Sequence, residues 1–176
     1  MYRLGLCYHN GDGVPQNKPK AIEIFEQAAG KGCAEAMNSL GTIHFRGDGV
    51  EIDREKAVEF FQRACDSGDI NAMVTLGELY LRGVNVIKEE PKATELFQRA
   101  SGKGSDLALY NLAKCYFSGQ GVPPNKARAI QLLELAAEKG NSDAMVLLAE
   151  CFERGIAKPE DRLQQYLFFF LSFFFQ

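Results

Sequence analysis

Residues 36–49 read AMNSLGTIHFRGDG, and a version of this phrase returns every 36 residues along the chain. At its centre a leucine is followed by a tiny residue, with no insertion or deletion between copies. The five copies are Leu4-Gly5, Leu40-Gly41, Leu76-Gly77, Leu112-Ala113 and Leu148-Ala149. A constant period of this length is typical of a stacked repeat array, in which each unit packs only on its neighbours.

One repeat unit can be followed through residues 33–68. Apolar residues at helical spacing over 34–45 predict a first helix, which we call helix A. Gly47 is expected to end it in a left-handed conformation, because glycine has no Cβ atom to clash there. A second helix, helix B, is expected to begin after Asp53 and to end at Gly68 in the same way. Each repeat is therefore helix A, a glycine-containing loop, helix B and a short turn.

The residues that mark the helix ends recur with the same period. Helix A ends before Gly11, Gly47, Gly83, Gly119 and Gly155, and helix B before Gly32, Gly68, Gly104 and Gly140. The N-cap position of helix B holds Asn17, Asp53, Glu89, Asn125 and Asp161. Four of these five side chains are good N-caps, Glu89 being the exception. The sequence predicts an all-α solenoid of 36-residue helix-turn-helix repeats.

Glycine inside a helix A is unusual, because it costs about 1 kcal/mol relative to alanine. Gly5, Gly41 and Gly77 therefore indicate that something packs very close to the helix at this point. We expect the backbone of a neighbouring helix to be that close neighbour. A large ring recurs a few residues later and is expected to lie in the core with its polar tip outward. The ring position holds Tyr8, His44, Tyr80, Tyr116 and Phe152.

The composition is that of a globular protein, with 46% hydrophobic and 24% charged residues. A net charge of −3 gives no basic footprint, so nucleic acid is not an expected partner. No second cysteine position recurs that could form a disulfide in each repeat, which favours reduced, buried thiols and a cytoplasmic location. The five cysteines are Cys7, Cys33, Cys65, Cys115 and Cys151.

The repeated pattern A-x-x-x-L-G-x-x-Y-x-x-G-x-G-V, followed by K-A-x-x-x-F-x-x-A-x-x-x-G, resembles the Sel1-like repeat. One full copy is carried by Ala36, Leu40, Gly41, His44, Gly47, Gly49, Val50, Lys56, Ala57, Phe61, Ala64 and Gly68. The resemblance covers roughly residues 1–157. It implies a relative of the tetratricopeptide array, a right-handed superhelix of helix pairs, whose members mostly act as adaptors in protein complexes.

The period divides the chain into six parts. They are a partial repeat 1–32, full repeats 33–68, 69–104 and 105–140, a partial repeat 141–162, and an apolar, phenylalanine-rich tail 163–176. Met1 falls inside a helix A, so we expect it to be an internal methionine of a longer array.

The tail 163–176 has four possible interpretations. It could be a last helix B covered by something missing, a membrane-surface anchor, an unstructured sticky tail, or sequence from a mispredicted exon. It is too short to span a bilayer and lacks the basic face of an anchor helix. We therefore expect a truncated or artefactual end, and membrane contact is the less favoured alternative.

No catalytic constellation is present in the sequence. His44 replaces a core tyrosine, His9 lies near a helix end, and the cysteines lack the close pairing of a zinc site. The Gly-Asp-Gly loops lack the lysine and the hydroxyl residue of a phosphate loop, and the closing glutamate of a calcium loop. We expect no enzyme activity, cofactor, metal or small-molecule substrate. The family resemblance includes β-lactam-binding bacterial members, but these carry a disulfide in every repeat, which this chain lacks.

Residues that vary between repeats fall on one face of helix A, at spacing i, i+4 and i+7. In the resembled family this face lines the concave side of the superhelix, where it could bind a peptide through aromatic anchors and charged selectors. We call this set the helix-A stripe. Its residues are Asn38, Thr42, Phe45, Val74, Glu78, Leu81, Tyr110, Lys114, Phe117, Val146 and Glu150. An equally favoured alternative is that Phe45, Leu81 and Phe117 pack against the next repeat.

The favoured function is a non-catalytic scaffold or adaptor that binds protein partners or peptides. Arg46, Arg82 and Arg154 recur at the end of helix A and are expected to complement its dipole, with an acidic-peptide clamp as the less favoured role. Two alternatives remain open. One is a membrane-associated quality-control adaptor, and the other is a fragment of a larger signalling protein with a catalytic domain elsewhere.

Overall fold

Helices make up the regular secondary structure of residues 1–156, the part of the chain that the computed structural model describes. The helices of this part are α1 Tyr2–Asn10, α2 Lys18–Gly30, α3 Ala34–Arg46, α4 Arg54–Asp66, α5 Ile70–Arg82, α6 Glu90–Gly102, α7 Asp106–Ser118, α8 Lys126–Glu138 and α9 Ser142–Glu153. Odd-numbered helices are helix A of each repeat, and even-numbered ones are helix B. The N-cap Asp161, the end of the last repeat and the tail 163–176 lie outside the described residues.

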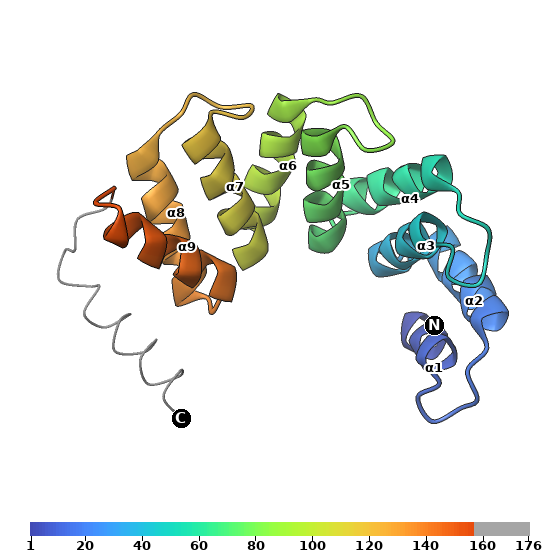
Figure 1. The fold of residues 1–176 in the computed structure, drawn as a ribbon. Helices are drawn as coiled ribbons and strands as arrows, with labels where there is room; N and C mark the ends of the chain where they lie inside the picture. Colours follow the sequence, from blue (N-terminus) through green and yellow to red (C-terminus); the bar gives the residue numbers. More distant parts are fainter. Residues whose placement is uncertain (157–176) are drawn as a thin grey trace.

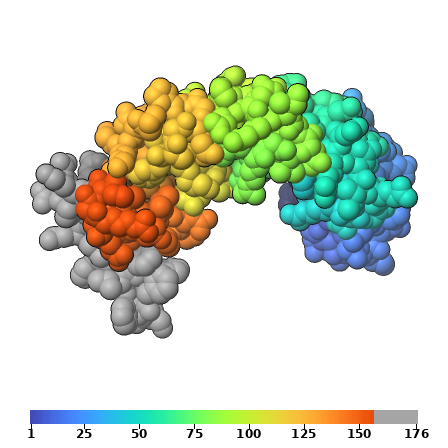
Figure 2. All heavy atoms as spheres, turned by 45° about the horizontal axis from the view of Figure 1, so that its top comes forward, coloured from blue at the N-terminus to red at the C-terminus, as the bar shows by residue number. Residues whose placement is uncertain are grey.

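The helices stack in chain order into an arch (Figure 1). The extensive helix contacts within residues 1–156 join each helix to the next one along the chain, both inside a repeat and between repeats. The inner side of the arch is hollowed (Figure 2), and α1, α3 and α9 lie nearer to it than α2, α4 and α8 (Figure 1). The predicted all-α superhelical solenoid is confirmed.

The glycines end the helices as the sequence predicts. Gly47 has φ of 72°, and its N–H donates to the carbonyl oxygen of Ile43 at 2.9 Å. Gly68, in the turn after α4, has φ of 90°. The glycines at equivalent positions in the other described repeats also have positive φ. These are left-handed conformations in which a side chain would be strained, so the recurrence of glycine has a backbone cause.

The N-caps of helix B also agree with the prediction from the sequence. Asn17, Asp53 and Asn125 each accept a hydrogen bond from the backbone N–H three residues on, at 2.9–3.0 Å. Glu89 makes no such bond, in keeping with its poor capping geometry.

Helix A has its own recurring cap, which the sequence analysis missed. Asp69, Ser105 and Asn141 accept hydrogen bonds from the backbone N–H groups of Ala72, Ala108 and Ala144. The equivalent residue before α3 is Cys33, and its side chain makes no cap bond. The second repeat therefore has a weaker start to helix A than its neighbours.

The tiny residue of helix A packs against a large side chain of helix B. A Cβ atom placed on Gly5, Gly41 or Gly77 would lie 2.5–2.7 Å from ring carbons of Phe25, Phe61 or Phe97. The close neighbour is thus an aromatic ring, and the prediction of a neighbouring helix backbone is wrong. Each ring is almost fully buried. It reaches the helix-A backbone because no side chain stands in between.

Candidate protein-binding surface

The helix-A stripe is unevenly exposed. Val74 is only 5% exposed and belongs to the core. Lys114, Val146 and Glu150 are exposed, and the remaining members are half-buried. The stripe therefore offers half-buried side chains on α3 and α5, both half-buried and exposed ones on α7, and exposed ones on α9.

The three apolar members at the end of helix A serve partly as core. Phe45, Leu81 and Phe117 pack against the buried cluster that runs through the repeats, yet each keeps part of its surface in solvent. The guanidinium carbon of Arg54 lies 5.8 Å from the centre of the Phe45 ring. Packing between repeats and an exposed apolar edge thus coexist at this position.

A polar network joins the stripe across α5 and α7. Asn111 Nδ2 donates to Glu78 Oε1 at 3.2 Å, and Lys114 Nζ donates to Asn111 Oδ1 at 3.4 Å. Lys114 Nζ also lies 4.8 Å from the centre of the Tyr110 ring, within the range of a cation–π contact. The amide of Asn111, 5% exposed, therefore holds two opposite charges at fixed positions beside an aromatic ring.

The environment of Tyr110 further favours the protonated form of its hydroxyl. Burial raises the pKa of this phenol, and the carboxylates of Asp143 and Glu150 raise it further. A protonated phenol can both donate and accept a hydrogen bond. Tyr110 thus combines a large apolar ring with a polar tip near two acidic groups of α9.

A small cavity of about 170 Å³ lies at the other end of the stripe, between α1 and α3. It is lined by Leu6 and His9 from α1 and by Asn38, Thr42 and Arg46 from α3, among others. Asn38 Oδ1 is enclosed and has no hydrogen-bond partner among the described residues. An enclosed acceptor of this kind is costly to leave unpaired, because it has given up its hydrogen bond to water.

One side of this cavity is closed by an electrostatic cluster between the first two repeats. His9 Nε2 lies 2.8 Å from Asp48 Oδ2, and Lys18 Nζ donates to Asp48 Oδ1. The Lys18 ammonium, helped by His9, lowers the pKa of the Asp48 carboxyl. Asp48 thus anchors a loop of the second repeat to the first.

The repeat model of one known family matches nearly the whole chain. The Sel1 repeat is matched at residues 1–33, 34–69, 70–105, 106–141 and 142–164. This chain belongs to the Sel1 repeat family. Proteins with Sel1 repeats are generally scaffolds for protein interactions, and the helical solenoid described here has that architecture.

Solved Sel1 repeat structures resemble this one closely. A Sel1 repeat protein from Oxalobacter formigenes is 31% identical, with a TM-score of 0.85 over 93% of this chain and 68% of the other. A protective antigen of uropathogenic Escherichia coli strains is also 31% identical, with a TM-score of 0.82 over 92% of this chain and 35% of the antigen.

A third similar structure is the cysteine-rich protein B of Helicobacter pylori. It is 25% identical, with a TM-score of 0.60 over 76% of this chain and 96% of the other. A comparison with the curated proteins gave no match.

The cysteines of this Sel1 repeat chain are free thiols. Cys65, Cys115 and Cys151 are buried, whereas Cys7 and Cys33 are half-buried, so full burial was predicted for two residues too many. Burial raises the pKa of Cys65 to about 12 and that of Cys115 to about 11. These two thiols are therefore unreactive packing residues at neutral pH.

Membrane-spanning helices and clusters of metal ligands can be considered for residues 1–156. No helix in this part is long and apolar enough to cross a membrane. No group of three or more potential metal ligands is brought together among the same residues. The site that this Sel1 repeat array does assemble consists of hydrogen-bonding, charged and aromatic groups on helix A.

Asn111 is the residue of this surface that sequence reasoning missed. Its position within helix A holds Arg3, Ser39, Thr75 and Leu147 in the other repeats. That variation was a usable signal, since the position lies next to the stripe. Its partner Glu78, however, is 33 residues away, and only the stacking of α5 on α7 brings the two together.

Proposed function

We propose that this Sel1 repeat chain is a non-catalytic adaptor that binds an extended segment of a protein partner along the helix-A stripe. The network of Glu78, Asn111 and Lys114 is the observation that carries this proposal. It fixes a carboxylate and an ammonium on neighbouring repeats, and a purely structural surface has little need to order two long charged side chains.

The chemistry around the network favours a partner with one apolar anchor and charges of both signs. Tyr110 and Phe117 offer aromatic surface on the same helix as Lys114. Aromatic and charged side chains of this kind dominate the energetics of protein interfaces.

We further propose a cytoplasmic location for this adaptor. The support is that all five cysteines are free thiols, because disulfides are typical of oxidising compartments. Localisation of the tagged chain by microscopy, compared with compartment markers, tests this part.

Selection of binders from a random peptide display library tests the main proposal, because it requires no identified partner. The full chain is the bait, and selected peptides are titrated against Tyr110→Ala/Lys114→Ala. The matched control is Glu138→Ala/Lys139→Ala, which alters the last residue of α8 and its C-cap, both exposed and in the same repeat.

We expect the stripe variant to lose at least about tenfold in affinity, as hot-spot truncation does, and the control to bind like the wild type. Circular dichroism shows whether both variants keep the wild-type helicity. Equal loss in both variants, or none in either, would contradict the proposal.

A further inference from the structure

Two departures from the repeat pattern coincide in the second repeat. The ring position holds tyrosine or phenylalanine in every repeat except this one, where it is His44. The loop before α4 and the first turn of α4 carry acidic residues at 51, 53 and 55, whereas no other described repeat has more than one acid at these positions. Their equivalents are Pro15, Asn17 and Pro19, then Ile87, Glu89 and Pro91, then Pro123, Asn125 and Ala127.

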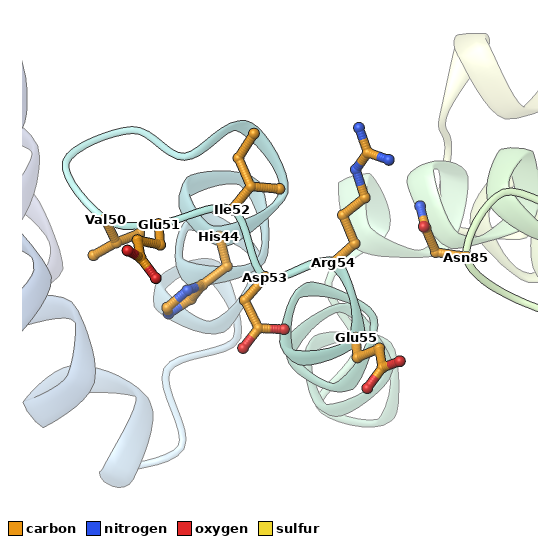
Figure 3. Close-up of a pocket in the computed structure, with 8 residues that line it drawn as sticks. All are labelled: His44, Val50, Glu51, Ile52, Asp53, Arg54, Glu55 and Asn85. Atoms are coloured by element: carbon orange, nitrogen blue, oxygen red, sulfur yellow. The ribbon is translucent and has the colours of Figure 1, made fainter.

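These departures meet in one cavity. It has a volume of about 620 Å³ and is lined by His44 and residues 50–55 from the second repeat and by Asn85 from the third. Glu51, Asp53 and Glu55 point to one side of the segment and Ile52 and Arg54 to the other, with the His44 ring between Glu51 and Asp53 (Figure 3). A cavity of this size accommodates a long side chain.

The three acidic residues of this segment, Glu51, Asp53 and Glu55, form no ion pair among the described residues, although the cations Arg54 and Lys56 are close by. Asp53 uses its carboxylate to cap α4, and Arg54 points away from the acids with its guanidinium near Phe45.

His44 adds an unused hydrogen-bonding group. Its side chain is 6% exposed and stacks on Phe60, and both ring nitrogens lack a partner in the described part of the chain. Burial, and then the charge of Lys56, lower the pKa of this imidazole, so it is neutral near pH 7 and can accept a hydrogen bond.

The first and third repeats satisfy the same position with a lysine of helix B. Tyr8 Oη accepts a hydrogen bond from Lys20 Nζ at 2.8 Å, and Lys92 Nζ lies 4.3 Å from the centre of the Tyr80 ring. The equivalent lysine of the second repeat, Lys56, makes no such bond to His44. The second repeat therefore lacks the internal lysine contact that its neighbours have.

We infer that this cavity is a second binding site, which takes a lysine or arginine side chain from a basic segment of a partner protein. The cationic group would lie among Glu51, Asp53 and Glu55, beside the His44 imidazole, which lines the same cavity and has two nitrogens without a partner among the described residues. The site lies beside the loop between α3 and α4 and shares no residue with the helix-A stripe. The inference of this second site can therefore be tested independently of the proposed function.

Histidine-detected NMR on the full chain tests this inference, because His9 and His44 are the only histidines. The probe is the acetylated peptide Gly-Gly-Arg-Gly-Gly, compared with the same peptide in which neutral citrulline replaces arginine. We expect the arginine peptide to shift the ring resonances of His44, assigned with His44→Phe, and to leave those of His9 in place. The citrulline peptide should shift neither.

A second experiment removes the negative charges of the proposed site. Glu51→Gln/Asp53→Asn/Glu55→Gln keeps the α4 cap and should weaken binding of the arginine peptide about tenfold at low salt, the combined effect of three exposed charge pairs. Glu23→Gln/Glu95→Gln/Glu138→Gln removes three exposed charges from other helices and should leave binding unchanged.

Three results would overturn the inference. They are equal shifts of His9 and His44, equal affinity of the two triple variants, and equal binding of the citrulline peptide. Putrescine, a free diamine, serves as a further probe. If it binds more tightly than the arginine peptide, the site takes a small free cation, and the assignment to a protein partner is overturned.

Discussion

Gly41 and Phe61 occupy one shared space in the core of the second repeat. A Cβ atom on Gly41 would lie 2.7 Å from Cδ1 and Cε1 of Phe61, a distance that packed carbon atoms do not tolerate. The same relationship joins Gly5 to Phe25 and Gly77 to Phe97. In the fourth repeat the equivalent residues are Ala113 and Leu133, both fully buried, so a larger residue on helix A accompanies a smaller one on helix B.

Gly41→Ala is therefore expected to destabilise the protein despite the better helix propensity of alanine. Propensity favours alanine by about 1 kcal/mol, whereas overpacking a rigid core costs about 1–3 kcal/mol. Adding Phe61→Leu to Gly41→Ala recreates the pair of the fourth repeat and should recover part of the loss. Urea denaturation of both single variants and the double variant measures the coupling free energy, expected at about 0.5–3 kcal/mol.

The fourth repeat supplies the reciprocal control for this cycle. Ala113→Gly leaves Leu133 without its contact and adds backbone freedom to α7, so it should lower the free energy of unfolding by about 1 kcal/mol. Strict additivity of Gly41→Ala and Phe61→Leu would contradict the shared-space explanation.

Cys33→Ser should stabilise the protein. Serine at this position would give α3 the cap that Ser105 gives α7, where Oγ accepts from the Ala108 N–H at 3.1 Å. N-caps of this type contribute about 0.5–2 kcal/mol. Thermal unfolding under reducing conditions measures the gain, and Ser105→Cys should show a loss of similar size. A Cys33→Ser variant with unchanged stability would mean that the helix start is already satisfied by solvent.

Much of the fold could be predicted from the sequence, because each structural position occurs in several repeats and the residues found there can be compared. The helix ends at Gly47 and Gly68 and the cap at Asp53 follow from local backbone chemistry, so they could be predicted. The N-cap position of helix A could also have been found, since Asp69, Ser105 and Asn141 recur there at the same interval. Contacts across helices are different, because their register depends on how the repeats stack.

Two pairs of residues in contact show what could not be predicted from the sequence. The ring of Phe61 rather than a backbone approaches Gly41, and the choice between them depends on the distance between α3 and α4. Asn111 meets Glu78 only through the rotation of α7 against α5. Varying positions could mark the helix-A stripe, but they could not show which of its residues lie in the core, as Val74 does.

His44 makes stability depend on pH. Its folded pKa lies below the ordinary value of 6.5, chiefly through burial, with Lys56 lowering it further and Asp53 and Glu26 opposing the shift. The unfolded chain therefore binds the proton more tightly, and stability falls as pH drops below 6.5 toward the folded pKa. His44→Phe should flatten this part of the profile and add about 1 kcal/mol near pH 7, since it removes two buried nitrogens that lack partners.

Urea denaturation between pH 5 and 8 compares the two proteins. His9 is present in both and cancels in the difference between them. A difference that does not change with pH would show that His44 titrates alike in the folded and unfolded states.

Asp69 makes stability depend on pH in the opposite direction to His44. Burial raises the pKa of its carboxyl above the ordinary 3.8, with Glu35 adding to the shift and the Ala72 N–H opposing it. The folded state then binds the proton more tightly, and stability declines as pH rises from 3.8 through the folded pKa. Asp69→Asn keeps the cap, as Asn141 does for α9, and should be more stable than the wild type at pH 7.

The test for Asp69 is the pH dependence of unfolding between pH 3 and 7. The difference between Asp69→Asn and the wild type should grow as pH rises through the titration and then become constant. A variant that is less stable at every pH would show that the charge of Asp69 favours the cap more than its burial disfavours it.

Glu78→Gln separates the charge of the helix-A stripe from its architecture. Glutamine keeps an oxygen that can accept from Asn111 Nδ2, so the network and the helicity should persist. The negative charge next to Lys114 is lost, and a peptide that places a basic residue there should bind about tenfold more weakly, whereas one with a neutral residue should be unaffected. Titration of both peptides by calorimetry at low and physiological salt measures the difference. Because the charge acts through space, the loss should shrink as salt rises, and a loss that is equal for both peptides would mean that Glu78 only supports the fold.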